Sequence, residues 1–368
     1  IVAEVEGPAP AVTIIERDDP AAVVQALADL TGKPPMRALW TLGYHQCRYS
    51  YVPQARVWEV AQQFRARKIP CDVVWLDIDY MDGFRCFTFD KETFADPEDL
   101  FRDLHHHGFK AVCMIDPGLK VDPEYSVYWS GHAADHFIRR ADGREYHGLV
   151  WPGQCAFPDY TRADVREWWS HLYTDFMSLG IDGVWNDMNE PAVFLGPLKS
   201  MPDDNRHKAD PELGGPGPHT QYHNIYGMQK VRAKREGIHR ALPDRRPFVL
   251  TRANFLGGHR YAATWTGDNR SDWRHLRWSI PMALNLGLSG QPFVGPDIGG
   301  FVGEADGELF ARWMGIGALL PFARGHTVTG SADHEPWSFG PECEAICKAA
   351  LERAGFTPVD VHMSDLQA

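Results

Sequence analysis

From Arg37 towards its end, the sequence alternates short apolar segments of strand length with longer segments that have one apolar face at helical spacing. Strands that alternate with helices pair in parallel, and eight such units close into a barrel. The sequence therefore predicts an α/β fold, a (β/α)8 TIM barrel. We expect its strands at residues 38–42, 71–79, 109–116, 181–185, 247–252, 261–265, 292–295 and 318–322. We expect helices at residues 53–68, 97–107, 163–179, 222–240, 272–286 and 307–317.

The predicted barrel occupies residues 36–352, and the 368-residue chain suits one such barrel with insertions. Residues 1–35 are expected to be a linker or the remnant of a preceding domain, with a short helix from Pro20 to Leu30. Residues 194–220 are rich in Pro, Gly and Asp and predict a loop insertion. Residues 353–368 form an atypical tail. Because the chain begins at Ile1 with no leader-like segment, we expect it to be part of a longer protein.

The composition excludes several classes of partner. The net charge of −12 argues against nucleic acid or an anionic membrane surface, and the apolar runs are too short to span a bilayer. The seven cysteines are odd in number and scattered, which favours free thiols in a reducing compartment such as the cytoplasm or a plastid. No pattern points to a cofactor or a bound metal.

The segment Gly183–Pro191 contains two carboxylates, two amides and a tryptophan, a composition that fits the mouth of a strand rather than its middle. Similar polar side chains follow most of the other predicted strands. Parallel strands of a barrel all present their carboxyl ends at one face, where active sites lie. That face is therefore expected to carry Asp77, Asp79, Asp116, Asp187, Glu190, Arg252, Trp265, Asp268, Asp297, Arg324 and His326.

A face so rich in acids serves either glycoside cleavage by paired carboxylates or a divalent-metal site. Asp187 and Asp268 follow strands that are two apart, and aromatic residues surround the acids, which favours a bound sugar ring. The run His105-His106-His107 resembles a metal clip, but adjacent residues of a helix point in different directions, so we interpret it as a solvated helix end.

Five motifs appear in one order along the chain: Trp75-Leu-Asp-Ile-Asp79, Trp185-Asn-Asp-Met-Asn-Glu190, Trp265-Thr-Gly-Asp-Asn269, Gly295-Pro-Asp-Ile-Gly-Gly-Phe301 and Pro321-Phe-Ala-Arg-Gly-His326. In these motifs the chain resembles the catalytic barrel of the glycoside hydrolase family 31 α-glucosidases, over residues 37 to about 340.

The resemblance implies a retaining mechanism with Asp187 as nucleophile and Asp268 as general acid/base. We expect Arg252 to keep Asp187 ionised, and burial and the charge of Asp187 to raise the pKa of Asp268. Glu190 is interpreted as a supporting acceptor behind the nucleophile. The residues implied to bind the sugar are Asp77, Ile78, Trp151, Trp185, Met188, Arg252, Trp265, Asp297, Phe301 and His326.

The implied activity is that of an exo-acting α-glucosidase on maltose, short α-glucans or a glucosylated glycan. Two alternatives stay open: another activity of the family (α-xylosidase, transglucosidase or α-glucan lyase), or an inactive barrel that binds a glucan or a partner subunit. The family's flanking β-domains are not in this sequence, and the tail after Glu352 departs from the family pattern. Missing domains or a partner subunit are therefore expected to matter.

Overall fold

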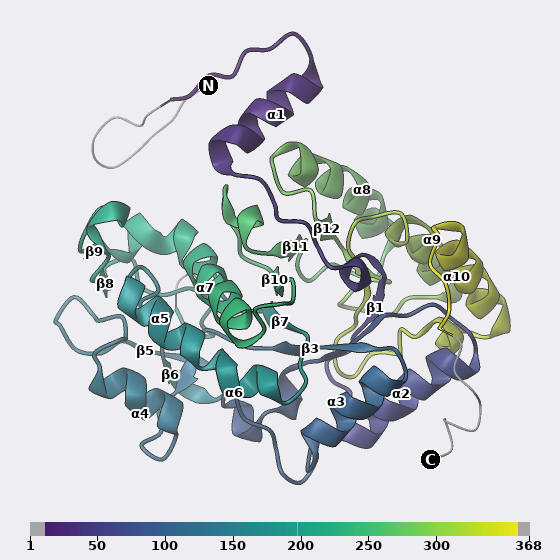
Figure 1. The fold of residues 1–368 in the computed structure, drawn as a ribbon, viewed down its shortest axis with the longest axis horizontal. Coiled ribbons are helices and arrows are strands. Elements are labelled where there is room, and N and C mark those ends of the chain that lie inside the picture. The colour runs from purple at the N-terminus through teal and green to yellow at the C-terminus, as the bar shows by residue number, and fades with distance from the viewer. Residues whose placement is uncertain (1–11, 197, 360–368) are drawn as a thin grey trace.

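The computed structural model describes residues 12–196 and 198–359, so the ends of the predicted N-terminal remnant and C-terminal tail lie outside the described residues. Its centre is a parallel sheet in the order β12-β11-β10-β7-β3-β2-β1-β14-β13 (Figure 1). The strands are β1 (Tyr44–Gln46), β2 (Val73–Leu76), β3 (Lys110–Met114), β7 (Gly183–Asn186), β10 (Phe248–Thr251), β11 (Ala263–Trp265), β12 (Val294–Gly295), β13 (Asp297–Ile298) and β14 (Ala323–Gly325).

The two ends of this strand order adjoin in the chain. Only Pro296 separates β12 from β13, and a proline has no N–H to continue a ladder. The two short strands thus occupy one position, and the sheet curls into a nearly closed barrel. The predicted fold class is confirmed.

Two of the eight predicted strands were placed too early. Residues 38–42 were predicted as the first strand, but Leu39–Leu42 form a 3₁₀ helix in which Leu39 is exposed. Residues 318–322 were predicted as the eighth, but they follow helix α9 (Gly307–Gly317) as a turn that leads into β14. In both cases the strand itself is polar and buried, with His45 and Gln46 in β1 and Arg324 in β14, so an apolar run does not mark it.

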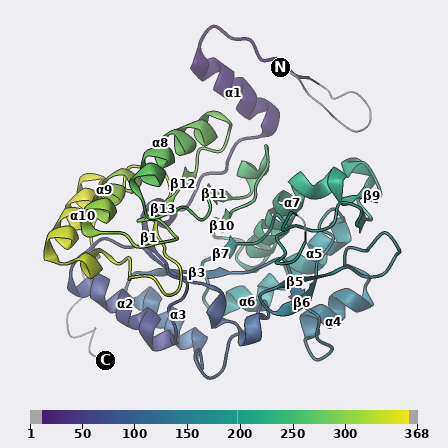
Figure 2. The same ribbon diagram turned by 180° about the vertical axis from the view of Figure 1, so that it is seen from behind.

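The helices cover the outside of the barrel (Figures 1 and 2). The predicted helix at 163–179 is interrupted at Leu172, which divides it into two. The helices are α1 (Pro20–Thr31), α2 (Gln54–Ala66), α3 (Pro97–His106), α4 (Ser126–Ala133), α5 (Ala163–His171), α6 (Tyr173–Ser178), α7 (His219–Ala241), α8 (Trp273–Leu288), α9 (Gly307–Gly317) and α10 (Pro341–Arg353). No helix of the described part is both long and apolar enough to cross a membrane.

Two small antiparallel additions lie beside the barrel. A three-stranded sheet of β4 (Leu119–Lys120), β6 (Gly153–Ala156) and β5 (His147–Val150) follows β3, in a region for which no strand was predicted. The predicted loop at 194–220 contains a hairpin of β8 (Arg206–His207) and β9 (Gly217–Pro218). A backbone bridge between Arg139 and Arg206 joins this insertion to the chain near the small sheet.

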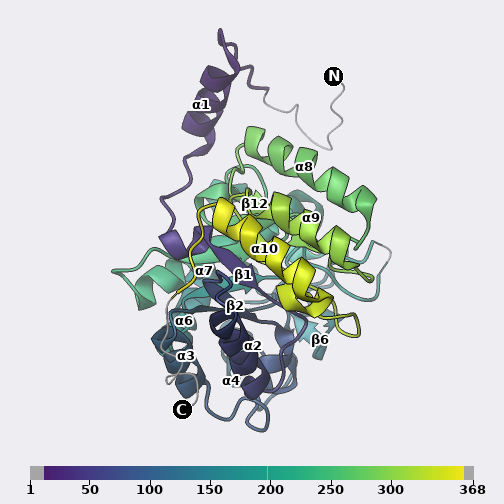
Figure 3. The same ribbon diagram turned by 90° about the vertical axis from the view of Figure 1, so that its right-hand side faces the viewer.

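Helix α1 confirms the helix predicted near Pro20. The Asp19 carboxylate accepts a hydrogen bond from the Ala22 N–H at 2.8 Å, and Pro20 occupies the first turn. The helix has no buried residue and projects from the barrel (Figure 3). At the other end of the described residues, Val359 lies against Gly108. The domain boundaries at 35 and 352 remain predictions.

The barrel interior is aromatic around one buried cation. The rings of Trp75 and Trp265 each contact that of Trp185, with centroids 5.8 and 5.5 Å apart. The Arg324 guanidinium lies 4.7 Å from the Trp185 ring centroid and donates to Asp297 at 2.6 Å. The polar residues at the ends of the strands lie next to this cluster.

Candidate active site

A cavity of about 190 Å³ opens at the carboxyl ends of the barrel strands. This volume is below the roughly 300–1,000 Å³ typical of pockets for drug-sized ligands, so it suits one small chemical unit. The lining residues are Tyr49, Asp77, Ile78, Met114, Trp151, Trp185, Asp187, Met188, Arg252, Asp268, Phe301, His326 and Val328. Other surface hollows of the protein are larger, but those contain neither Asp187 nor Asp268.

Most of the predicted site residues lie around this cavity, and three lie behind it. Trp265 is buried beneath Trp185, Asp297 is buried against Arg324, and Glu190 binds the far side of Arg252. The lining residues Tyr49, Met114 and Val328 were not predicted. Val328 could have been found, since it follows His326 by two residues.

The backbone turns sharply directly after β7. Met188 has a φ of 51°, an uncommon left-handed value for a residue other than glycine. The Asp187 carboxylate accepts a hydrogen bond from the Met188 N–H at 2.8 Å. The buried Asn189 amide donates to the Thr251 hydroxyl at 3.0 Å, which ties this turn to the end of β10. The turn therefore fixes where the Asp187 carboxylate points.

Arg252 joins the two predicted catalytic acids. Its Nη1 atom lies 3.0 Å from Oδ1 of Asp187 and 3.6 Å from Oδ2 of Asp268. Its Nε and Nη2 atoms donate to the two oxygens of Glu190 at 2.8 and 3.0 Å. Burial opposes the charged form of Arg252, but the three carboxylates outweigh burial and raise its pKa. The guanidinium is thus a permanent cation between the acids.

The pKa of Asp268 is raised, first by burial and further by the charge of Asp187, while Arg252 opposes the shift. Because 47% of the Asp268 side chain is exposed, solvent screens part of these interactions. The direction agrees with that expected of a group that must carry a proton.

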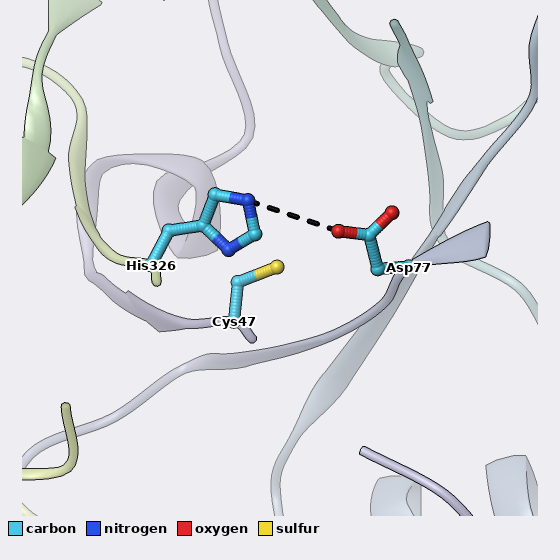
Figure 4. Close-up of side chains that lie close together, drawn as sticks. All are labelled: Cys47, Asp77 and His326. Atoms are coloured by element: carbon cyan, nitrogen blue, oxygen red, sulfur yellow. Dashed lines mark ion pairs between the residues drawn. The ribbon is translucent and has the colours of Figure 1, made fainter. Parts of the chain in front are cut away.

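Asp77 and His326 face each other on another side of the cavity (Figure 4). The His326 Nε2 atom lies 3.7 Å from Oδ2 of Asp77, and the other Asp77 oxygen accepts from the Ile78 N–H at 2.7 Å. Burial raises the pKa of Asp77 and lowers the pKa of His326, which favours the neutral form of both. Neutral groups of this kind can both donate to and accept from hydroxyl groups.

Two buried lysines of the barrel, one of which interacts electrostatically with Asp187, were not predicted from the sequence. Lys230 and Lys234 of α7 both donate to the Ile115 carbonyl oxygen, at 2.9 and 2.7 Å. Burial lowers the pKa of Lys230 to about 8, and burial followed by the charge of Asp187 raises the pKa of Asp116 to about 7. The signal was present in the sequence, since Tyr226, Lys230 and Lys234 repeat every four residues and share one helix face.

The histidine run at the end of α3 lies away from the cavity. His105 pairs with Asp182 at 2.6 Å, and His107 is buried, whereas His106 is exposed. The interpretation as a solvated helix end was therefore wrong for His107, whereas His105 is half-buried in the last turn of the helix. Asp182 directly precedes β7, so this pairing joins α3 to the end of the barrel opposite the cavity.

Comparison with known proteins gives a match to the model of the "Glycosyl hydrolases family 31 TIM-barrel domain" over residues 34–356. This chain belongs to glycoside hydrolase family 31. The family 31 barrel is 48% identical to "Alpha-glucosidase 2" of Bacillus thermoamyloliquefaciens over 329 residues, which are 89% of this chain and 41% of that protein. It is 41% identical to human "Neutral alpha-glucosidase C" over 92% of this chain and 37% of that protein.

Solved structures agree with this assignment of the family 31 barrel. The structure titled as a family 31 α-glucosidase from Bacteroides thetaiotaomicron has a TM-score of 0.84 and 54% identity, over 92% of this chain and 55% of that one. An ER glucosidase II heterodimer, with catalytic subunit and binding domain of the regulatory subunit, has a TM-score of 0.87 and 39% identity over 91% of this chain and 36% of that one. The chain spans about two fifths of the length of the curated relatives it matches.

Proposed function

We propose that this family 31 barrel is a retaining, exo-acting α-glucosidase that hydrolyses terminal α-linked glucose from maltose, short α-glucans or a glucosylated glycan. The observation that carries the proposal is the contact of one Arg252 nitrogen with both Asp187 and Asp268 at a cavity sized for one small unit. The relatives named above as α-glucosidases support the choice of reaction and sugar.

In the first step, an oxygen of Asp187 forms a bond to the anomeric carbon while the bond to the leaving oxygen breaks. Asp268 gives its proton to that oxygen, and a glycosyl ester of Asp187 results. In the second step, Asp268 takes a proton from water, whose oxygen bonds to the anomeric carbon as the ester bond breaks. The charge on Asp187 thus disappears and returns once in each cycle, beside the fixed charge of Arg252.

The distances support retention rather than inversion. Oδ1 of Asp187 and Oδ2 of Asp268 share one nitrogen as neighbour, so their separation cannot exceed the sum of its 3.0 and 3.6 Å contacts. That limit admits the separation of about 5–5.5 Å found in retaining glycosidases and excludes nearly all of the 6.5–9.5 Å range of inverting ones.

We assign binding of the sugar hydroxyls to Asp77 and His326, whose neutral forms are favoured by burial. Ile78, Trp151, Trp185, Met188 and Phe301 supply the apolar walls. Trp265 and Asp297 do not line the cavity but support it: Trp265 packs under Trp185, and Asp297 pairs with Arg324. Glu190 holds the guanidinium of Arg252 in its bridging position.

The test is covalent trapping with a 5-fluoro-glucosyl fluoride, followed by mass spectrometry of the peptides. We expect the label on Asp187. A label on another residue would contradict the assigned roles. A folded protein that takes no label would favour the alternative of an inactive barrel that binds glucan or a partner.

We also propose a reducing compartment and contact with a further domain or subunit. All seven cysteines are free and buried, including Cys343 and Cys347, whose sulfurs lie 3.9 Å apart. The outer face of α8 exposes Trp278, Leu284 and Leu288, and one solved relative is a heterodimer. Thiol titration of the protein purified without reductant tests the first point, and light scattering of the purified chain, which measures whether it associates, tests the second.

A further inference from the structure

Asp77 and His326 line the cavity, and the side chain of Cys47 lies close to both of them (Figure 4). A sulfur of Cys47, a carboxylate oxygen of Asp77 and a ring nitrogen of His326 all lie within 4.8 Å of one another, and all three residues are buried. They follow β1, β2 and β14, which are neighbours in the barrel. Each residue directly follows its strand, so the order of the barrel strands brings the three together.

The three atoms form a ligand set that suits zinc. Zn²⁺ accepts Cys, His and Asp ligands at about 2.0–2.3 Å, so two ligands of one tetrahedral ion lie roughly 3.3–3.6 Å apart. The 3.7 Å between His326 Nε2 and Asp77 Oδ2 is close to that separation. Three protein ligands also leave the fourth position of the ion open. Because Asp77 and His326 line the cavity, that position would face it.

The present contacts leave these atoms available to an ion. The Cys47 sulfur has a weak contact of 3.9 Å with the Arg48 carbonyl oxygen, and Nε2 of His326 faces Oδ2 of Asp77 at 3.7 Å, which is beyond hydrogen-bond distance. The nearby Arg324 cation would oppose a second cation, but it pairs with Asp297 at 2.6 Å. A thiolate and a carboxylate would balance the charge of Zn²⁺, and the thiol proton would be released to solvent.

We propose that Cys47, Asp77 and His326 bind Zn²⁺, and that the bound ion inhibits the enzyme by occupying the place of the sugar. The zinc site stands on the geometry of the three side chains. The competition rests on the proposed function, because it requires that Asp77 and His326 also bind the sugar hydroxyls.

The test uses Co²⁺ as a spectroscopic probe of the purified chain. The wild-type protein is expected to show a sulfur-to-cobalt charge-transfer band that Zn²⁺ abolishes by displacement. Cys47→Ser is expected to lose the band and to weaken Zn²⁺ binding in calorimetry by at least about tenfold. Cys71→Ser is the matched control, because Cys71 is also a buried thiol of the barrel but precedes β2 at its opposite end.

A wild-type protein without the band, a band that persists in Cys47→Ser, or a band lost in Cys71→Ser would each overturn the site. If Cys47→Ser does not fold, Asp77→Asn decides, since it keeps the thiol and should still weaken Zn²⁺ binding by at least about tenfold. Glucose should displace Co²⁺ from the wild type. Glucose that binds without displacing Co²⁺ overturns the competition. If glucose does not bind, the proposed function is contradicted. The metal site is then still tested by the cobalt band alone.

Discussion

The Nη1 atom of Arg252 lies 3.0 Å from Oδ1 of Asp187, and the Arg252 side chain is not free to rotate away from this position. Glu190 binds the other edge of the guanidinium through two hydrogen bonds, at 2.8 and 3.0 Å. A planar guanidinium held by a two-point contact keeps its third nitrogen in one position. Arg252 is therefore a fixed charge beside Asp187 and not a mobile counterion.

Replacing Arg252 should impair catalysis strongly. In Arg252→Gln the charge beside Asp187 and Asp268 is lost, and we expect kcat/KM to fall by roughly 10²–10³, the usual effect of losing one preorganised electrostatic contact. Glu190→Gln keeps a hydrogen-bonding oxygen for the guanidinium, so its kcat/KM should fall by less. Steady-state kinetics on an aryl α-glucoside measure both. An Arg252→Gln enzyme as active as Glu190→Gln would contradict the bridging role.

Asp268→Asn should lose activity on substrates with poor leaving groups far more than on those with good ones. Substrates with poor leaving groups need the proton, so their turnover should nearly vanish, whereas glucosyl fluoride needs none and should be spared much more. In the wild type, kcat/KM should fall as the pH rises through the pKa of Asp268, because the acid must be protonated. The raised pKa moves this fall to higher pH than for an ordinary aspartate. Equal losses on both substrates would refute the acid role.

His45 should make folding stability depend on pH. Burial, with the charge of Arg324, lowers its pKa to about 3 from an ordinary value of 6.5. In the unfolded chain His45 therefore binds a proton below about pH 6.5, whereas in the folded protein it stays neutral down to about pH 3. The free energy of unfolding therefore falls as the pH falls from 6.5 to 3. The slope reaches about 1.4 kcal/mol per pH unit.

In the wild type, the indole N–H of Trp75 donates to His45 Nδ1 at 3.1 Å. His45→Gln removes the titrating group and keeps an oxygen that can accept this hydrogen bond. Between pH 7 and pH 5, the wild type should lose about 2 kcal/mol more of unfolding free energy than the variant. Urea unfolding at the two pH values measures the difference. His106→Gln, at an exposed position, is the control and should follow the wild type.

The sequence predicted the barrel, and it named ten of the residues that line the cavity. Asp187 and Asp268 could be found because each lies within three residues of the expected end of a strand. Strands β1 and β14 were misplaced because their buried faces carry His45, Gln46 and Arg324 in place of apolar residues. A hydrophobic pattern fails where the interior of a barrel is polar, and here it is polar close to the cavity.

The contacts that orient the site were harder to predict. The bridge from Arg252 to Asp187 joins residues 65 positions apart, and its geometry depends on Glu190. The Lys230 and Lys234 ammonium groups of helix α7 donate to the carbonyl oxygen of Ile115, directly after β3. The repeat along the helix shows that the two lysines share a face, but it does not reveal this backbone partner. Such partners are set by packing, which a single sequence does not display.

Two tryptophans at the cavity should separate binding from stability. Trp151 sits in the turn between β5 and β6 and is 38% exposed, whereas Trp185 is buried among the aromatic rings of the barrel interior. Trp151→Ala should remove a wall of the sugar site alone. We expect KM to rise roughly five- to tenfold, equivalent to about 1–1.4 kcal/mol for one ring contact, with kcat and the melting temperature little changed.

Trp185→Ala should behave in the opposite way, because its ring contacts Trp75 and Trp265 as well as the cavity. Loss of a fully buried aromatic side chain costs about 3–5 kcal/mol, so the melting temperature should fall by many degrees. Thermal unfolding and kinetics of both variants decide the matter. If Trp151→Ala lowered the melting temperature as much as Trp185→Ala, Trp151 would be a packing residue and the apolar wall of the sugar site would have to be assigned elsewhere.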